Sequence, residues 1–304
     1  MRPDGRAAIV TGVLAGLSVI ATAAQNPPVF RSSTSAVAVD VSVTDGRRAI
    51  AGLGAADFEL SDNGVAQVIT ASALGSIPID VTLVVDTSAS LQGKLLEQFK
   101  RDIQAIGGML RAEDRLRLVT FATHAADAFG WRPGGSGLPL PRIAAGGATA
   151  FYQTLGATML RQTEPGRRHL IVALSDGFDT VSLLDGVDVR DLARAATSVL
   201  HVVIRRLSGV PPGSRGWVPY GGPGNNDALR DAAETTGGRF RTVSSETPLT
   251  DVFRTALDEF RTGYVLWYTP TGVAPGGWHA VQVKVKNPRL VVRARTGYDA
   301  GEKR

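Results

Sequence analysis

The chain has 304 residues, of which 43% are hydrophobic and 20% charged, and its formal net charge is +5. This length allows one full-sized hydrophobic core and a smaller second one. The charge excess is small for the length, basic residues form no run of five or six, and aromatic residues make up only 6%. These features argue against a dedicated nucleic-acid-binding protein.

Residues 1–24 have the pattern of an export signal. Arg2 and Arg6 precede a mainly apolar stretch, Ala7 to Ile20, and small residues follow up to Ala24. The apolar stretch is shorter than the roughly 20 residues that span a bilayer. We therefore expect a cleaved signal rather than a membrane anchor, no stable membrane insertion afterwards, and a periplasmic or secreted mature protein. With no cysteine in the chain, packing alone or with a metal must hold its fold.

Residues 25–77 predict a linker followed by a short β segment. From Val37 to Val43, valines alternate with polar or small residues, which is the period of a strand with one buried face. Residues Phe58 to Ile69 have the form of two strands joined by an Asn63-Gly64 hairpin turn.

Residues 78–262 predict an α/β domain. The mainly apolar run Ile79 to Val85 is typical of a strand buried on both faces. Strands and helices then alternate; the expected strands are 116–121, 169–174, 199–204 and 239–243, and the expected helices are 91–110, 151–161, 189–196, 227–235 and 249–261. This order favours a doubly wound, mostly parallel sheet flanked by helices.

Residues 263–304 predict strands again, at 264–268, 280–285 and 290–294. Neither end of the chain has enough strands to bury a face alone. We therefore expect both ends to meet in one small β subdomain beside the α/β domain.

Three segments rich in oxygen donors should open onto one edge of the α/β sheet. The run Asp86-Thr87-Ser88-Ala89-Ser90 follows the first buried strand, Gly146 to Thr149 precedes a helix, and Ser175 to Asp179 follows a later strand. Hydroxyls and carboxylates suit Mg²⁺, Mn²⁺ or Ca²⁺, whereas a chain with no cysteine and four scattered histidines offers little to Zn²⁺. The alternative is that the first run is only a capped turn between strand and helix.

The residues of these segments resemble the metal ion-dependent adhesion site of von Willebrand factor type A domains. Asp86, Ser88 and Ser90 match its D-x-S-x-S signature, Thr149 matches its threonine, and Asp176 its second aspartate. The chain ends, with Asp57-Phe58-Glu59, Gly263 to Leu266 and Arg295 to Tyr298, resemble bacterial exported proteins with a "VWFA-related" domain.

The resemblance implies that Ser88, Ser90 and Thr149 bind a cation directly, while Asp86 and Asp176 act largely through water. One position on the ion then stays open for an Asp or Glu side chain of a protein partner. The expected function is a metal-dependent adhesion or assembly module. Asp179 could support the metal ligands from behind, but the favoured interpretation is a solvated loop aspartate.

An enzyme is the less favoured interpretation. Phosphatases with an aspartate nucleophile in this position carry a second Asp where this chain has Ser88, so the general acid is missing. No G-x-S-x-G motif occurs, and we interpret His124, His169, His201 and His279 as surface or strand-end residues. A scaffold with a structural or vestigial metal site and a metal-assisted hydrolase remain as alternatives.

The stretch Arg205 to Asn226 is rich in proline and glycine, and it follows a strand that should end at the metal edge. Arg206, Trp217 and Tyr220 are its candidate contacts to an acidic partner, since arginine attracts carboxylates and aromatic side chains supply contact area. The alternative is a surface insertion without a role.

Overall fold

The computed structural model describes residues 36–301, apart from 47, 75–76, 90–93, 136–137, 139–141, 207–225 and 245. The expected export signal and almost all of the expected linker lie outside these residues. Within the described ranges, no helix is both long enough and apolar enough to cross a membrane.

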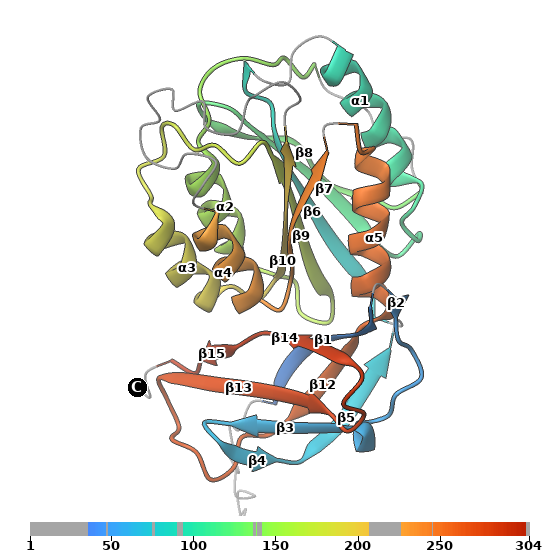
Figure 1. The fold of residues 1–304 in the computed structure, drawn as a ribbon, viewed down its shortest axis with the longest axis vertical. Coiled ribbons are helices and arrows are strands. Elements are labelled where there is room, and N and C mark those ends of the chain that lie inside the picture. The colour runs from blue at the N-terminus through green and yellow to red at the C-terminus, as the bar shows by residue number, and fades with distance from the viewer. Residues whose placement is uncertain are drawn as a thin grey trace, which may run out of the picture. The chain divides into compact units, whose positions relative to one another are not determined.

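One six-stranded sheet forms the α/β part of the chain, with strand order β11-β10-β9-β6-β7-β8 (Figure 1). Its strands are β6 (Ile79–Asp86), β7 (Arg115–Phe121), β8 (Ala125–Pro133), β9 (Arg168–Ser175), β10 (Val199–Arg206) and β11 (Phe240–Ser244). Neighbouring strands pair in parallel except β7 and β8, which are antiparallel. The α/β fold agrees with the prediction, but the sheet is mixed, and strand β8 was not predicted. Only Phe129 of that strand is buried, so β8 lacks the apolar signal of the other strands.

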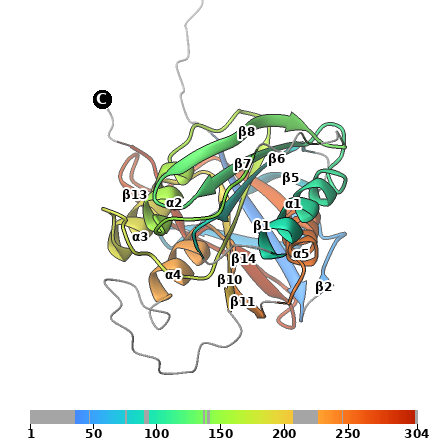
Figure 2. The same cartoon turned by 90° about the horizontal axis from the view of Figure 1, so that it is seen from above.

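Helices cover both faces of this sheet. They are α1 (Lys94–Gly107), α2 (Phe151–Met159), α3 (Gly186–Ala195), α4 (Asp227–Thr235) and α5 (Leu249–Thr262). Helices α1 and α5 pack on one face, and α2, α3 and α4 on the other (Figures 1 and 2). On α5 the predicted apolar stripe is buried as expected; its residues are Phe253, Ala256, Leu257 and Phe260.

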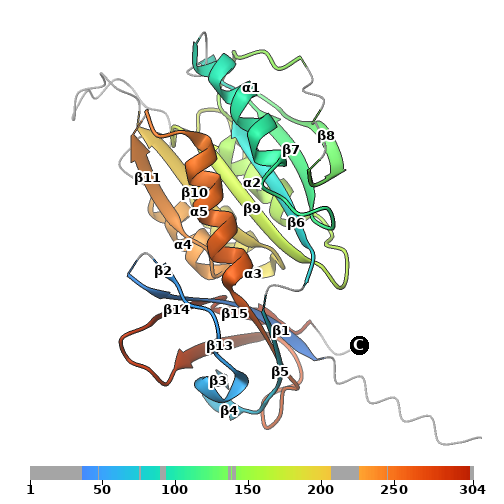
Figure 3. The ribbon, with the colours of Figure 1, turned by 90° about the vertical axis from the view of Figure 1, so that its right-hand side faces the viewer.

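The two chain ends meet in two antiparallel sheets (Figure 3). The first contains β1 (Val37–Asp45), β2 (Arg48–Ala49), β5 (Ile69–Leu74), β12 (Tyr264–Tyr268) and β14 (Val291–Ala294); the second contains β3 (Phe58–Asp62), β4 (Val65–Gln67), β13 (Trp278–Val285) and β15 (Gly297–Asp299). A 3₁₀ turn at Ala55–Asp57 precedes β3. Strand β1 pairs with β12 and β14, and β3 pairs with β13, so both ends supply each sheet. The Asn63-Gly64 turn joins β3 to β4 with both φ angles positive, as the hairpin prediction requires.

His201 was assigned wrongly from the sequence, because it lies inside β10 and is 4% exposed. His279 lies at a strand end, as the second residue of β13, but it is only 1% exposed. The buried carboxylate of Asp62 binds His279 Nδ1 at 2.8 Å and accepts hydrogen bonds from the hydroxyls of Tyr268 and Tyr298, at 2.8 and 3.0 Å. These partners satisfy Nδ1 of the buried ring, while Nε2 is buried without a hydrogen-bond partner in the described part of the chain.

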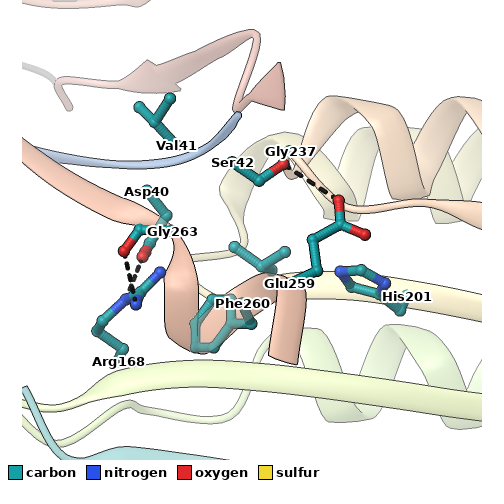
Figure 4. A pocket seen from close by; sticks show the side chains of 10 residues that line it. Asp40, Val41, Ser42, Arg168, His201, Gly237, Glu259, Phe260 and Gly263 are labelled. Atoms are coloured by element: carbon teal, nitrogen blue, oxygen red, sulfur yellow. Dashed lines mark hydrogen bonds and ion pairs between the residues drawn. The ribbon is translucent and has the colours of Figure 1, made fainter. Parts of the chain in front are cut away.

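Ion pairs and hydrogen bonds join α5 and the α/β strands to β1. Figure 4 shows Arg168 beside Asp40 and Ser42 beside Glu259. Glu259 on α5 is 8% exposed at its side chain and binds Arg239 at 2.5 Å and Arg241 at 3.2 Å. The Ser42 hydroxyl of β1 donates to the same carboxylate at 3.2 Å. Beside it, Arg168 binds Asp40 at 2.6 Å, and the cavity between these groups, about 10 Å³, has room for roughly one water molecule.

Replacing Glu259 should therefore weaken the fold. We expect Glu259→Ala to lower the free energy of unfolding by about 3 kcal/mol, because it leaves two arginines without their buried carboxylate. The neighbouring Asp258 is exposed, and Asp258→Ala should change stability by less than about 0.5 kcal/mol. Urea unfolding of the two variants measures both values, and equal losses would contradict the assignment.

Candidate metal centre

Asp86 lies at the centre of the candidate site, at the carboxyl end of β6. All eight residues of this strand are buried, and Asp86 itself is 6% exposed. Its Oδ1 accepts a hydrogen bond from the Ser88 backbone N–H at 2.8 Å, and its Oδ2 one from the Ser175 hydroxyl at 2.7 Å. One oxygen of the carboxylate is therefore held by the loop that follows β6, and the other by the last residue of β9.

The electrostatics of Asp86 reflect this position. Burial raises its pKa above the ordinary value, the hydrogen bonds from Ser88 and Ser175 lower it, and the negative charge of Asp176 raises it. Asp86 and Asp176 are thus close enough to repel each other. A cation placed between two such carboxylates would remove that repulsion.

The loop before α2 is tied directly to the Asp86 segment. The Gly146 N–H donates to the Thr87 carbonyl at 2.9 Å, and the Ala89 N–H donates to the Gly147 carbonyl at 3.4 Å. Gly147 has a φ of +84°, and a Cβ there would lie 2.6 Å from the Thr123 hydroxyl. Only glycine fits this close approach without strain.

Thr149 ends this loop with a buried side chain, 5% exposed. Its backbone N–H donates to the Thr180 hydroxyl at 2.8 Å, and its carbonyl accepts from the Thr180 N–H at 2.8 Å. Within the described part of the chain, its own hydroxyl has no hydrogen-bond partner. That oxygen is therefore free to bind a ligand at the sheet edge.

Asp176 follows β9 directly. Since β9 runs parallel to β6, with Leu174 opposite Val85, Asp176 emerges at the same edge as Asp86. It is half-buried, and its Oδ1 accepts a hydrogen bond from the Phe178 N–H at 3.2 Å. The second oxygen of Asp176 is not used in this turn.

The structure thus brings the segments of Asp86, Ser88, Thr149 and Asp176 to one edge, as predicted, while Ser90 lies outside the described residues. Among the described residues, no three Asp, Glu, His or Cys side chains gather in a group able to hold a metal. The candidate set has only two acids, and its other donors are hydroxyls. Ser175, which fixes the Asp86 carboxylate, was placed in one of the three oxygen-rich segments but was not predicted as a site residue.

Asp179 is not the solvated loop residue that the sequence suggested. It is 5% exposed, and its Oδ2 accepts the Tyr152 N–H in the first turn of α2 at 2.7 Å. The Ser182 hydroxyl likewise accepts the Gln153 N–H at 3.0 Å. Ala150, at the N-cap, has no side chain for this role, so residues from another loop satisfy the helix terminus.

Of the three predicted partner contacts, only Arg206 is described. It is the last residue of β10 and is exposed. Ile204, two residues earlier, pairs with Ser175 of β9. It therefore lies at the same edge as the candidate metal residues. Trp217 and Tyr220 lie outside the described residues.

Solved structures with a similar backbone include von Willebrand factor type A domains, as the motif resemblance implies. The ArnB paralog VWA2 from Sulfolobus acidocaldarius is 12% identical, with a TM-score of 0.49, over 84% of this chain and 74% of that one. A von Willebrand factor type A protein from Catenulispora acidiphila is 14% identical, with a TM-score of 0.43, over 90% and 74%.

Proximal thread matrix protein 1 from the mussel byssus, solved with a zinc-occupied MIDAS motif, is 16% identical, with a TM-score of 0.45, over 64% and 48%. No protein-family model matches the chain, and no curated protein matches its sequence. At these identities the solved structures show a shared fold alone. The chemistry of the sheet edge is therefore inferred from this chain's own residues.

Asp176 and Asp179, which both follow β9, should contribute differently to the free energy of unfolding. We expect Asp179→Ala to lower the free energy of unfolding by about 1–2 kcal/mol, because α2 loses its cap. Asp176→Ala should change it by less than about 0.5 kcal/mol, since it removes a charge that repels Asp86. Chemical unfolding in metal-free buffer tests both, and a larger loss for Asp176→Ala would show that the roles are reversed.

Proposed function

We propose that this protein is a metal-dependent protein-binding module that captures a carboxylate of a partner through a divalent cation. The observation that carries the proposal is the convergence of three loops at the carboxyl edge of the sheet. The Gly146 loop is hydrogen-bonded to Thr87 at 2.9 Å, and the Ser175 hydroxyl to Asp86 at 2.7 Å. Open α/β sheets bind their ligands at this edge.

The donor chemistry fits Mg²⁺, Mn²⁺ or Ca²⁺. Hydroxyl and carboxylate oxygens are hard donors, which these ions prefer. Ser88, Ser90 and Thr149, with the carboxylates of Asp86 and Asp176, would hold the ion. A bound cation would supply a positive charge at the rim of the sheet, where an Asp or Glu side chain of a partner can reach it.

The same edge favours binding over catalysis. Asp179 is the third carboxylate in the loops around the site, and its oxygens are used to cap α2 and to bind Ser182. It is therefore not placed to act as the general acid that a metal-assisted hydrolase would require. A scaffold with a purely structural metal differs in another way, since its partner binding would not depend on the cation.

We also propose that the mature protein acts outside the cytoplasm, which the export signal expected in residues 1–24 supports. Arg206 would lie beside the partner's acidic group, with Trp217 and Tyr220 adding contact area. Arginine pairs well with carboxylates because its planar guanidinium offers two parallel donors.

Calorimetric titration with Mg²⁺ or Mn²⁺ tests the site. We expect wild-type protein to bind one ion with a dissociation constant on the order of 10⁻⁴ to 10⁻³ M, because few formal charges contact the ion. Asp86→Ala should abolish binding, and Asp258→Ala, which removes an exposed aspartate of α5, should leave it unchanged. Equal binding by wild type and Asp86→Ala would refute the metal site.

The function itself is tested by capture of a partner from the exported proteins of the source cells. Capture should occur with Mg²⁺ and be lost with chelator or in Asp86→Ala. Capture that persists with chelator would favour the scaffold, and metal-dependent turnover of simple phosphate esters would favour the hydrolase.

A further inference from the structure

A recess of about 400 Å³ lies at the opposite end of the α/β strands from the candidate metal centre. Its lining comes from β13 and β14, from the end of α4, and from Gly238, which lies just before β11. Arg293 is the third of the four residues of β14, the edge strand of its sheet, and pairs with Ser42 of β1. Its guanidinium is the group of this recess that could bind an anion.

Arg293 belongs to a cluster of three arginines around one carboxylate. Glu259 already binds Arg239 and Arg241, and it accepts a third hydrogen bond from Ser42. Within the described part of the chain, nothing accepts a hydrogen bond from the Arg293 guanidinium, and its Nη1 is buried without a partner. A buried donor of this kind is costly to leave unsatisfied.

Charges of both signs act on Arg293. Burial lowers its pKa, and the positive charges of Arg239 and Arg241 lower it further, while Glu259 and Glu234 act in the opposite direction. Glu234 is exposed and forms no ion pair among the described residues. His201, also near this cluster, stays neutral at pH 7, because burial lowers its pKa to about 4.

The other arginine of the recess is already in use. Arg295 donates to the Gly297 carbonyl at 2.6 Å and to the Ala196 carbonyl, just after α3, at 3.2 Å. It therefore fastens β14 to the end of α3, as basic side chains do at helix C-termini. Arg293 remains as the guanidinium of the recess that has no hydrogen-bond partner in the described part of the chain.

We propose that this recess binds a small oxyanion, a carboxylate or a phosphate, on Arg293. Guanidinium pairs with either group through charge-assisted hydrogen bonds. Val281, Val283 and Val292, which pack in or against the β core, also line the recess, so an anion with a short apolar chain fits it better than a bare one. The site involves none of the candidate metal residues and is independent of the proposed function.

Titration calorimetry with inorganic phosphate, acetate and hexanoate tests the proposal. The buffer should be free of divalent cations, so that carboxylates cannot bind at the metal edge, and free of chelators, which are themselves carboxylates; sodium chloride keeps the ionic strength constant. We expect wild-type protein to bind phosphate or hexanoate with a dissociation constant on the order of 1 mM. Binding stronger for hexanoate than for acetate would identify the ligand as a carboxylate with an apolar chain, and binding strongest for phosphate would identify it as a phosphate.

Arg293→Gln should weaken this binding by at least about tenfold. The control is Arg289→Gln, which removes the same charge from an exposed residue of the preceding turn and should stay within about twofold of wild type. Equal affinities for wild type and Arg293→Gln, or no binding of any of the three anions to wild type, would overturn the proposal.

A melting experiment gives a second, independent readout. Without anions other than chloride, Arg293→Gln should melt at the same temperature as wild type or above it, since the repulsion among the three arginines falls. Phosphate or hexanoate should then raise the melting temperature of wild type more than that of the variant. A lower melting temperature for Arg293→Gln in chloride would mean that Arg293 stabilises the fold without a ligand, which overturns the proposal.

Discussion

Asp86 ends a strand whose residues are all buried, so its carboxylate is held where the interior of the sheet meets the loops. A buried carboxylate is costly unless hydrogen bonds or an opposite charge compensate it. The Ser88 N–H and the Ser175 hydroxyl provide part of that compensation. The nearby charge of Asp176 works against it, and this conflict at the centre of the sheet edge is what a bound cation would resolve.

The loops around Asp86 divide their polar groups between stability and binding. Asp179 and Ser182 satisfy the first turn of α2, and Thr180 holds the backbone of Thr149. These contacts fix the loops while leaving the Thr149 hydroxyl and one oxygen of Asp176 without a structural task in the described part of the chain. A preformed ligand site requires such an arrangement, in which the loops are rigid and some of their oxygen atoms remain available to a ligand.

Much of this architecture follows from simple patterns in the sequence. The apolar run of β6, the stripe of α5 and the strand Tyr264–Tyr268 could be predicted because burial on one or both faces leaves a periodic signal. Strand β8 could not, because its side chains are mostly exposed. The roles of Asp179 and of the buried His279 depend on partners far along the chain, Tyr152 and Asp62, which no local pattern reveals. The same holds for Arg293, whose charged neighbours Arg239, Arg241 and Glu259 lie elsewhere in the sequence.

The central claim is that a cation binds at the carboxyl edge of the six-stranded sheet, so the position of a bound cation tests it most directly. Anomalous diffraction from crystals of the full chain grown with Mn²⁺ measures that place. The account predicts one anomalous peak at the carboxyl edge of the six-stranded sheet, within bonding distance of the Ser88 and Thr149 hydroxyls and close to Asp86 and Asp176. A peak elsewhere, or none at this edge under saturating Mn²⁺, would contradict it.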